Sequence, residues 1–244
     1  MPSVGSLPKN HKSADPVVVG GLTPLTTIDY PGQLAAVVFL QGCPWRCGYC
    51  QNGNLLARKT TAAIPWQTVA KFLERRRGLL DAVVFSGGEP TLHARLDQAM
   101  SQVRAMDYRV GLHTAGIYPD RLQKLLALVD WVGMDIKAAQ SDYESITGVR
   151  GSAERAWRSA RLLSQSGVAH EFRTTVHPDV LDAGRLASLV AELKAIGAKN
   201  YVIQDCVSRH CRDESLRRVS SKRLSRQSLY QFAGKFEHFS LRQV

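Results

Sequence analysis

LAAVVFLQGCPWRCGYCQN, residues 34–52, joins a continuous apolar run to a loop that holds three of the five cysteines of the chain. The apolar run, residues 34–42, has the composition of a strand that is buried on both faces. The loop places Cys43, Cys47 and Cys50 in the spacing C-x3-C-x2-C. The sequence therefore predicts a buried strand whose carboxyl end carries a group of thiols.

Similar apolar runs recur along the chain and alternate with amphipathic segments. Further strands are predicted over 81–88, 109–116, 131–138, 171–176 and 200–207, and helices over 66–77, 92–106, 121–129, 153–165 and 181–196. Strands that alternate with helices indicate a parallel sheet with crossover helices. We expect an α/β fold, a partial (β/α)6 barrel with a parallel sheet and outer helices. A doubly wound sheet is the alternative.

The length of 244 residues favours a single domain. We expect a flexible tail over 1–16 and one domain over 17–244 that ends in a basic helical tail. The sequence contains neither the roughly 20 apolar residues of a membrane span nor the apolar run of a secretory signal. Clustered cysteines suit a metal site in a reducing compartment better than a set of disulfides. We therefore expect a cytoplasmic protein that is not bound to a membrane.

A formal net charge of +11 is compatible with nucleic acid, an anionic cofactor or an acidic protein partner. Basic residues concentrate in helical stretches such as LERRRG, residues 73–78, and in RRVSSKRLSR, residues 217–226. These stretches lack the interleaved aromatic residues of a groove for single-stranded nucleic acid. We interpret them as solvated surfaces and regard nucleic acid as an unlikely partner.

The three clustered thiols predict a site for a soft metal, either zinc or an iron–sulfur cluster. A structural zinc site needs four ligands, so zinc would require a fourth ligand from elsewhere in the chain, such as Cys206 or Cys211. Three thiolates on a [4Fe-4S] cluster would instead leave one iron open to another ligand. At this stage both assignments remain.

Polar residues follow each predicted strand, in the segments QGC, SGGEP, HTAG, DIKA, TTVHP and QDC. The carboxyl ends of parallel strands lie at one edge of a sheet, so these segments define one face. Asp135 and Lys137 alternate with apolar residues and should point into the barrel mouth. There they can pair with each other or bind a zwitterionic ligand, because an unpaired buried charge is costly.

The motif CPWRCGYC resembles the C-x3-C-x-aromatic-C signature of radical S-adenosylmethionine (SAM) enzymes, and GGEP at 87–90 resembles their second-strand motif. Over residues 20–212 the chain is similar to the activating proteins of glycyl radical enzymes, above all to the longer anaerobic ribonucleoside-triphosphate reductase activating proteins. The resemblance implies a partial (β/α)6 barrel of the radical SAM type, a [4Fe-4S] cluster and SAM. It also implies that an electron from the cluster cleaves SAM to methionine and a 5'-deoxyadenosyl radical, which takes hydrogen from a glycine of a partner enzyme.

The same resemblance implies roles for single residues. Cys43, Cys47 and Cys50 would each bind one iron, and the amine and carboxylate of SAM would bind the fourth. We expect no catalytic residue beyond the cluster and SAM. The expected cofactor-binding residues are Gly87, Gly88, Glu89, Thr114, Asp135, Lys137 and Arg173. The glycines should allow a close approach of the methionyl group, and Glu89 should accept a hydrogen bond from its ammonium.

A few residues depart from the family or lack a clear role. His113 and Ala115 stand where related activating enzymes carry aspartate and asparagine, so a monovalent cation site there is in doubt. Asn52 is a candidate for a hydrogen bond to a cluster sulfide or to a backbone turn. We expect Cys206 and Cys211 to be free or adventitiously paired thiols.

The sequence thus predicts an activating enzyme that generates a glycyl radical on a partner enzyme, with anaerobic ribonucleoside-triphosphate reductase as the favoured partner. A flavodoxin or ferredoxin would donate the electron. The alternative within the superfamily is an enzyme that modifies a small molecule or an RNA base. A zinc-binding module without enzymatic activity is a third possibility, against which GGEP argues.

Overall fold

The computed structural model describes residues 15–218 and 224–242, and within these ranges the strands form one eight-stranded sheet that follows the order of the sequence. β1 pairs antiparallel with β2, and every later neighbouring pair is parallel. The strands are β1 Val19–Thr26, β2 Ala35–Leu40, β3 Ala82–Gly87, β4 Arg109–Thr114, β5 Trp131–Asp135, β6 Ala169–Val176, β7 Asn200–Asp205 and β8 His238–Arg242.

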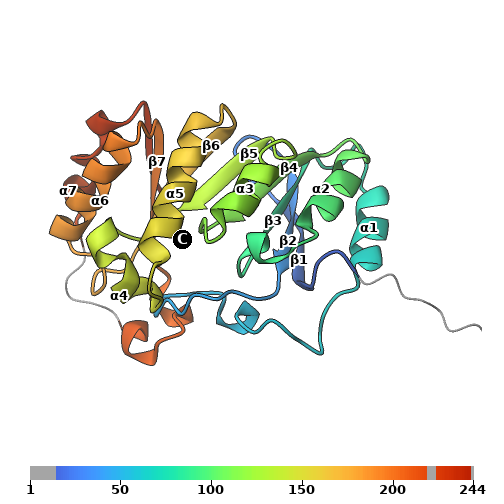
Figure 1. Cartoon of the computed structure of the whole chain (residues 1–244), viewed down its shortest axis with the longest axis horizontal. Helices are drawn as coiled ribbons and strands as arrows, with labels where there is room; N and C mark the ends of the chain where they lie inside the picture. The colour runs from blue at the N-terminus through green and yellow to red at the C-terminus, as the bar shows by residue number, and fades with distance from the viewer. Residues whose placement is uncertain (1–14, 219–223, 243–244) are drawn as a thin grey trace, which may run out of the picture.

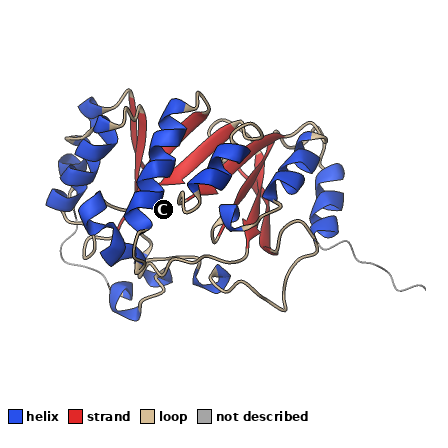
Figure 2. Cartoon of the chain, viewed as in Figure 1, coloured by secondary structure: helices blue, strands red, loops and turns tan. Residues whose placement is uncertain are grey.

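Helices cover one face of this sheet, as Figures 1 and 2 show. They are α1 Trp66–Glu74, α2 Leu96–Arg104, α3 Pro119–Leu125, α4 Tyr143–Thr147, α5 Ser152–Gln165, α6 Ala183–Ala195 and α7 Arg226–Tyr230. In Figure 1 the long segment after β2 runs along the edge of the sheet where the parallel strands end. It passes α4 and approaches the segment that follows β7.

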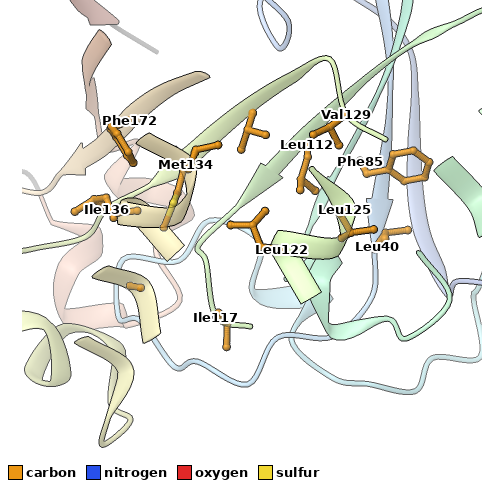
Figure 3. Close-up of a cluster of buried hydrophobic side chains, with 14 of the residues drawn as sticks. Leu40, Phe85, Leu112, Ile117, Leu122, Leu125, Val129, Met134, Ile136 and Phe172 are labelled. Carbon is orange, nitrogen blue, oxygen red and sulfur yellow. The ribbon is translucent and has the colours of Figure 1, made fainter. Parts of the chain in front are cut away.

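The main core lies between the sheet and the helices. Every second side chain of the central strands points to this face, including Leu40, Phe85 and Leu112, and packs against Leu122 and Leu125 of α3 (Figure 3). These residues are buried. The continuous apolar strands of the sequence arise because the alternate side chains are also covered, on the other face of the sheet.

The inner face of the sheet changes character along the strands. Near their amino ends, β2 and β3 contribute small and branched side chains, and Trp131 of β5 packs with them. In β5 the same alternation then brings Gly133 and Asp135 to this face, because Val132 and Met134 belong to the helix-side core. The amino end of the barrel is therefore filled by apolar side chains, and charged groups lie toward the carboxyl end.

The predicted fold class is confirmed. The six expected strands are β2 to β7, and the five expected helices correspond to α1, α2, α3, α5 and α6. β1, β8 and the short helix α4 were not anticipated. In the expected flexible tail, residues 1–14 lie outside the described residues, but Asp15 accepts hydrogen bonds from Trp66 N (3.3 Å) and Arg95 Nη2 (2.6 Å). The described part of the C-terminal tail contains α7 and the strand β8.

Candidate functional site

The cysteine loop begins where β2 ends and closes on itself through its backbone. Gly42 N donates to Leu55 O (2.6 Å) and Cys43 N donates to Leu56 O (3.1 Å), while Cys50 N donates to Cys47 O (3.2 Å). Cys47 is buried, and Cys43 and Cys50 are half-buried. The loop therefore presents its three thiols from one ordered turn at the carboxyl end of the sheet.

The short helix α4 anchors the same loop from the other side of the barrel mouth. Arg46 N donates to Thr147 O (2.8 Å), and the buried ring of Trp45 packs edge-on against Tyr143, with the ring centroids 5.6 Å apart. The aromatic residue of the loop, Tyr49, is also buried. Within the described residues its hydroxyl has no hydrogen-bond partner.

Two arginine side chains support the loop through its carbonyl groups. Arg46 Nη1 donates to Cys43 O (2.7 Å) and Trp45 O (2.9 Å). From the distant C-terminal segment, Arg212 Nη2 donates to Arg46 O (2.7 Å) and its Nε donates to Cys47 O (3.3 Å). Sequence reasoning did not identify either arginine, because their partners are backbone atoms and no motif marks such contacts.

Burial strongly affects the thiols themselves. It raises the pKa of Cys43 to about 12 and also raises the pKa of Cys47, while the charge of Lys137 lowers both. In the absence of a metal these two groups therefore remain protonated at neutral pH. Iron binds the thiolate form and deprotonates a coordinating thiol, so metal loading would release protons here.

Among the described residues, no three or more His, Cys, Asp or Glu side chains converge closely enough to hold a single metal ion. Thiolates that bind a [4Fe-4S] cluster need not meet at one point, because each binds a different iron. Three thiols in one loop, with no fourth protein ligand among the residues that the structure describes, therefore fit a cluster better than a closed zinc site.

The GGEP motif is hydrogen-bonded directly to the cysteine loop. Gly88 N donates to Leu40 O (2.8 Å), Glu89 N donates to Gly42 O (2.9 Å), and Asn52 Nδ2 donates to Gly87 O (3.1 Å). The Asn52 side chain thus donates to a backbone carbonyl, which is one of the two arrangements that we expected for it. These hydrogen bonds hold together two motifs that are far apart in the sequence.

Close packing against neighbouring backbone explains why the first two residues of this motif are glycines. Gly87 has a φ of +113°, and a Cβ there would meet the backbone N and O of Leu40. A Cβ on Gly88 would meet the carbonyl of Gly42. The close approach that excludes larger residues is therefore that of β2 and the cysteine loop. Contact of these glycines with SAM, which the sequence predicted, remains a prediction.

Glu89 is fully buried and bridges the ends of β3 and β4. Its Oε1 accepts from Thr91 N (3.0 Å) and Thr114 Oγ1 (2.7 Å), and its Oε2 accepts from Ala115 N (2.9 Å). Burial raises the pKa of Glu89, and the hydrogen bonds from Thr91 and Thr114 oppose that rise. Glu89 and Thr114, which were predicted separately, thus form one unit that fixes the backbone at the barrel mouth.

Asp135, Lys137 and Arg173 form a group of three charges on the inner face. Asp135 Oδ1 lies 3.0 Å from Arg173 Nε, and Asp135 Oδ2 lies 3.9 Å from Lys137 Nζ. Gly133 makes room for the guanidinium, since a Cβ there would lie 2.8 Å from Arg173 Cζ. The pairing of Asp135 with Lys137 was one of the two predicted arrangements. The group carries one excess positive charge.

Lys137 connects this group to the cysteine loop, because its Nζ lies 5.7 Å from the centroid of the Tyr49 ring. Burial alone lowers the pKa of Lys137, but Tyr49, Cys47 and Asp135 raise it well above its usual value. The ammonium therefore stays charged beside the thiols. An anionic cluster or the carboxylate of a bound amino acid would be stabilised in this position.

Two histidines near the ends of β4 and β6 are held in hydrogen bonds. His113 Nε2 lies 2.8 Å from Asp29 O, and burial, followed by the charge of Arg173, lowers the pKa of His113 to about 3. It is therefore neutral and donates to that carbonyl. His177 Nε2 lies 2.9 Å from Leu216 O. Both rings have structural partners.

The family model of the radical SAM superfamily matches residues 37–189, a range that begins in β2 and includes the cysteine loop, GGEP and the three charges. The chain belongs to the radical SAM superfamily. It is a radical SAM enzyme, and membership implies a [4Fe-4S] cluster and SAM as cofactors. Cys43, Cys47 and Cys50 are the thiols of the superfamily signature in this chain.

Curated relatives of this radical SAM enzyme include two similar in length. The first is a protein of Methanocaldococcus jannaschii that is assigned, by inference, to the glycyl-radical enzyme activating enzymes. It is 28% identical over 210 residues, which are 83% of this chain and 85% of the relative. The second is a pyruvate formate-lyase-activating enzyme of Clostridium pasteurianum, 32% identical over 180 residues, 69% of this chain and 74% of the relative.

Among solved structures, SuiB of Streptococcus suis bound to its precursor peptide SuiA has the same fold with a TM-score of 0.65. The match covers 84% of this chain at 14% identity, and this chain spans about half of SuiB (48%). In the described part of the radical SAM enzyme, no helix is both long and apolar enough to cross a membrane.

The described residues fit both cofactors. The three thiols lie on one loop, the Tyr49 hydroxyl is buried without a partner among the described residues, and the adjoining charges leave one excess positive charge for an anionic group. Cys43, Cys47 and Cys50 would hold the cluster. The backbone at Gly87 and Gly88, together with Lys137, would hold the amino-acid part of SAM.

Proposed function

We propose that this radical SAM enzyme is an activating enzyme that generates a glycyl radical on a partner enzyme. The observation that carries the proposal is the direct hydrogen bonding of the GGEP backbone to the cysteine loop, with Glu89 N 2.9 Å from Gly42 O. It joins the thiols and the expected methionyl site at one edge of the barrel. Similarity to activating enzymes over most of the chain supports the choice of substrate class.

Cys43, Cys47 and Cys50 would hold the cluster, which would supply the electron for cleavage of a carbon–sulfur bond of SAM. The residues of this chain bind and orient. Asn52 fixes the carbonyl of Gly87, and Glu89 accepts from Thr91 N in the turn that follows the motif. Lys137 and Arg173, balanced by Asp135, offer positive charge to a carboxylate. We assign Thr114 to the ribose side of the site, where it is held by Glu89.

The partner that we favour is an anaerobic ribonucleoside-triphosphate reductase, because the motifs most resemble those of its activating proteins. A flavodoxin or a ferredoxin would donate the electron. We place the reaction in a reducing compartment, the cytoplasm, because the described cysteines are all unpaired by disulfides and a cluster with one open iron needs protection from oxygen.

Anaerobic reconstitution with iron and sulfide, followed by a reductant and SAM, tests the radical chemistry. We expect 5'-deoxyadenosine and methionine as products. Candidate glycyl radical enzymes are then added, and the glycyl radical is detected by electron paramagnetic resonance. A signal that forms with the reductase and with no other candidate enzyme would support our choice of partner.

Two outcomes would contradict the proposal. If an intact cluster failed to cleave SAM even with each candidate partner present, the assigned reaction would be wrong. If SAM were cleaved and no glycyl radical formed with any candidate, the alternative of a small-molecule or RNA substrate would be favoured.

A further inference from the structure

The two cysteines outside the cluster loop lie against each other. Cys206 directly follows β7, and its backbone N donates to Val176 O (3.1 Å). A single 3-10 turn, Ser208–His210, then reverses the chain and ends in a hydrogen bond from Cys211 N to Ser208 O (2.9 Å). This turn brings the sulfur of Cys211 to 3.5 Å from the sulfur of Cys206.

The segment that contains this pair also supports the cluster loop. We call residues 206–217 the strap. Arg212 N donates to Cys50 O (2.9 Å), and Asp213 N donates to Gly48 O (2.9 Å). The Arg212 guanidinium bonds two further carbonyls of the loop, as described above. The strap thus donates hydrogen bonds to four carbonyl groups of the cluster loop. The cysteine pair lies where the strap leaves the sheet.

We propose that Cys206 and Cys211 are a thiol–disulfide modification site, and that their disulfide fastens the strap against the cluster loop. The geometry needs little change, because a disulfide is about 2.0 Å long and the sulfurs are already in contact. Cys206 is half-buried and reachable from solvent, whereas Cys211 is buried beside it. Cys206 can therefore attack a disulfide reagent that comes from solution, and Cys211 can then displace the reagent from Cys206.

The reaction is an exchange with a disulfide of the glutathione class. Cys206 sulfur attacks that disulfide, the S–S bond of the reagent breaks, and one molecule of thiol leaves. Cys211 sulfur then attacks the mixed disulfide on Cys206 and releases the second molecule of thiol. The two cysteine protons end on the two released thiols, the protein pair is oxidised by two electrons, and the reagent is reduced by two.

The surroundings favour a durable disulfide over a rapidly cycling one. Burial raises the pKa of Cys206 to about 12 and also raises the pKa of Cys211. Thiols with high pKa react slowly at neutral pH and are poor leaving groups, so a disulfide between them is broken slowly. Once formed, the disulfide would persist after the oxidant is gone and would keep the strap in place.

The test uses the full chain with its cluster reconstituted anaerobically, so that the three loop cysteines are held on iron. The protein is incubated with oxidised glutathione, alkylated and digested with trypsin. Because Arg209 separates the two cysteines, trypsin places Cys206 in peptide 200–209 and Cys211 in peptide 210–212. We expect one linked mass that a reductant splits, and the loss of two free thiols.

Cys211→Ser is the matched control, in which Cys206 should keep glutathione because no thiol can displace it. If the unaltered chain also kept glutathione on Cys206, if both thiols stayed free, or if either joined a loop cysteine, the proposal would be overturned. The second measurement is hydrogen exchange of residues 48–50 and 212–213. We expect exchange to slow roughly tenfold on oxidation of the unaltered chain and not in Cys211→Ser. Equal exchange in both forms would refute the fastening of the strap.

Discussion

The carboxylate of Asp135 on β5 lies 3.0 Å from the guanidinium of Arg173, its partner in the register of β5 and β6. The Arg173 side chain is only 8% exposed, against 35% for Asp135. The ammonium of Lys137 approaches the other carboxylate oxygen. Asp135 therefore compensates two buried cations at the barrel mouth.

Replacing Asp135 with Asn should lower the free energy of unfolding by about 1–3 kcal/mol. A fully buried pair costs about 3–5 kcal/mol to break, but water reaches Asp135 and screens the charges. Urea denaturation of the cluster-free protein at pH 7 measures the change. Asp120→Asn removes the exposed pair with Arg158 and should change stability by less than about 0.5 kcal/mol. Equal effects of the two variants would contradict the prediction.

The difference in stability between the unaltered chain and Asp135→Asn should depend on pH. Burial raises the pKa of Asp135, but Arg173 and Lys137 outweigh it and hold the pKa below the ordinary value. A depressed carboxyl pKa stabilises the fold above the unfolded value of about 3.9, and this stabilisation is lost as the pH falls through the folded value. The difference between the unaltered chain and Asp135→Asn should therefore shrink below about pH 4. A difference that persisted in acid would not come from the charge.

Replacing Glu89 with Gln should destabilise the protein by about 1–3 kcal/mol, although the two side chains have the same shape. All the partners described above for Glu89 donate, so the amide NH2 of Gln would face the N–H of Ala115 or the donors at Oε1. Thr114→Val, which removes only one of these donors, should have a smaller effect. Thermal unfolding of both variants in parallel would measure this order, and a reversed order would show that Glu89 is not the centre of the network.

Adding a methyl group at Gly88 should displace the cysteine loop. The Cβ of Ala would meet the Gly42 carbonyl, which cannot move without breaking its bond to Glu89 N. We expect a loss of about 1–3 kcal/mol and a lower yield of cluster on reconstitution. Gly184→Ala in the first turn of α6 is the control, because its nearest neighbour is 3.4 Å away and alanine favours the helix. Similar behaviour of the two variants would contradict this account.

Cluster loading should separate the five cysteines into two groups. Replacing Cys43, Cys47 or Cys50 with Ala should remove most of the iron and the absorbance near 400 nm, while circular dichroism shows an intact fold. Cys206→Ala and Cys211→Ala should keep about four irons per chain, as one [4Fe-4S] cluster requires. About eight irons, or loss of iron on changing Cys206, would mean that the pair binds metal itself.

Arg212 should influence the cluster electrostatically as well as mechanically. Its charge lies beside the carbonyls of Arg46 and Cys47, next to the cluster thiols. Positive charge favours the reduced cluster, so Arg212→Gln should shift the midpoint potential to more negative values. Arg212→Lys keeps the charge and should shift it less. A titration monitored by electron paramagnetic resonance gives both values, and an unchanged potential in Arg212→Gln would limit this residue to support of the loop.

The sequence was sufficient for the parts of the fold and site that depend on local pattern. Strands β2 to β7 were predictable because both of their faces are covered, which makes them continuous apolar runs. The thiols were predictable from their spacing, and the charges of Asp135 and Lys137 from alternation along one strand. Each of these signals lies within a few consecutive residues.

The partners that could not be named from the sequence lie in distant segments of the chain. The bond from Asn52 to Gly87, the salt bridge of Asp135 with Arg173 and the support of the loop by Arg212 all need the order of the strands to be known first. Cys206 and Cys211 were expected to be free or adventitiously paired thiols. The structure brings their sulfurs together through a turn that no strong sequence signal marks.

The two strands that the sequence did not reveal are also the two at the edges of the sheet. β1 contains two glycines and Pro24, and its register with β2 is irregular in two places. β8 is short, and its Arg242 is bound by Glu171 at 2.7 Å, across the neighbouring strand. Such strands are poor templates for a strand from another molecule. Features that obscured them in the sequence thus protect the sheet from edge-to-edge aggregation. A truncation that removed β8 would expose the regular, apolar edge of β7 to that risk.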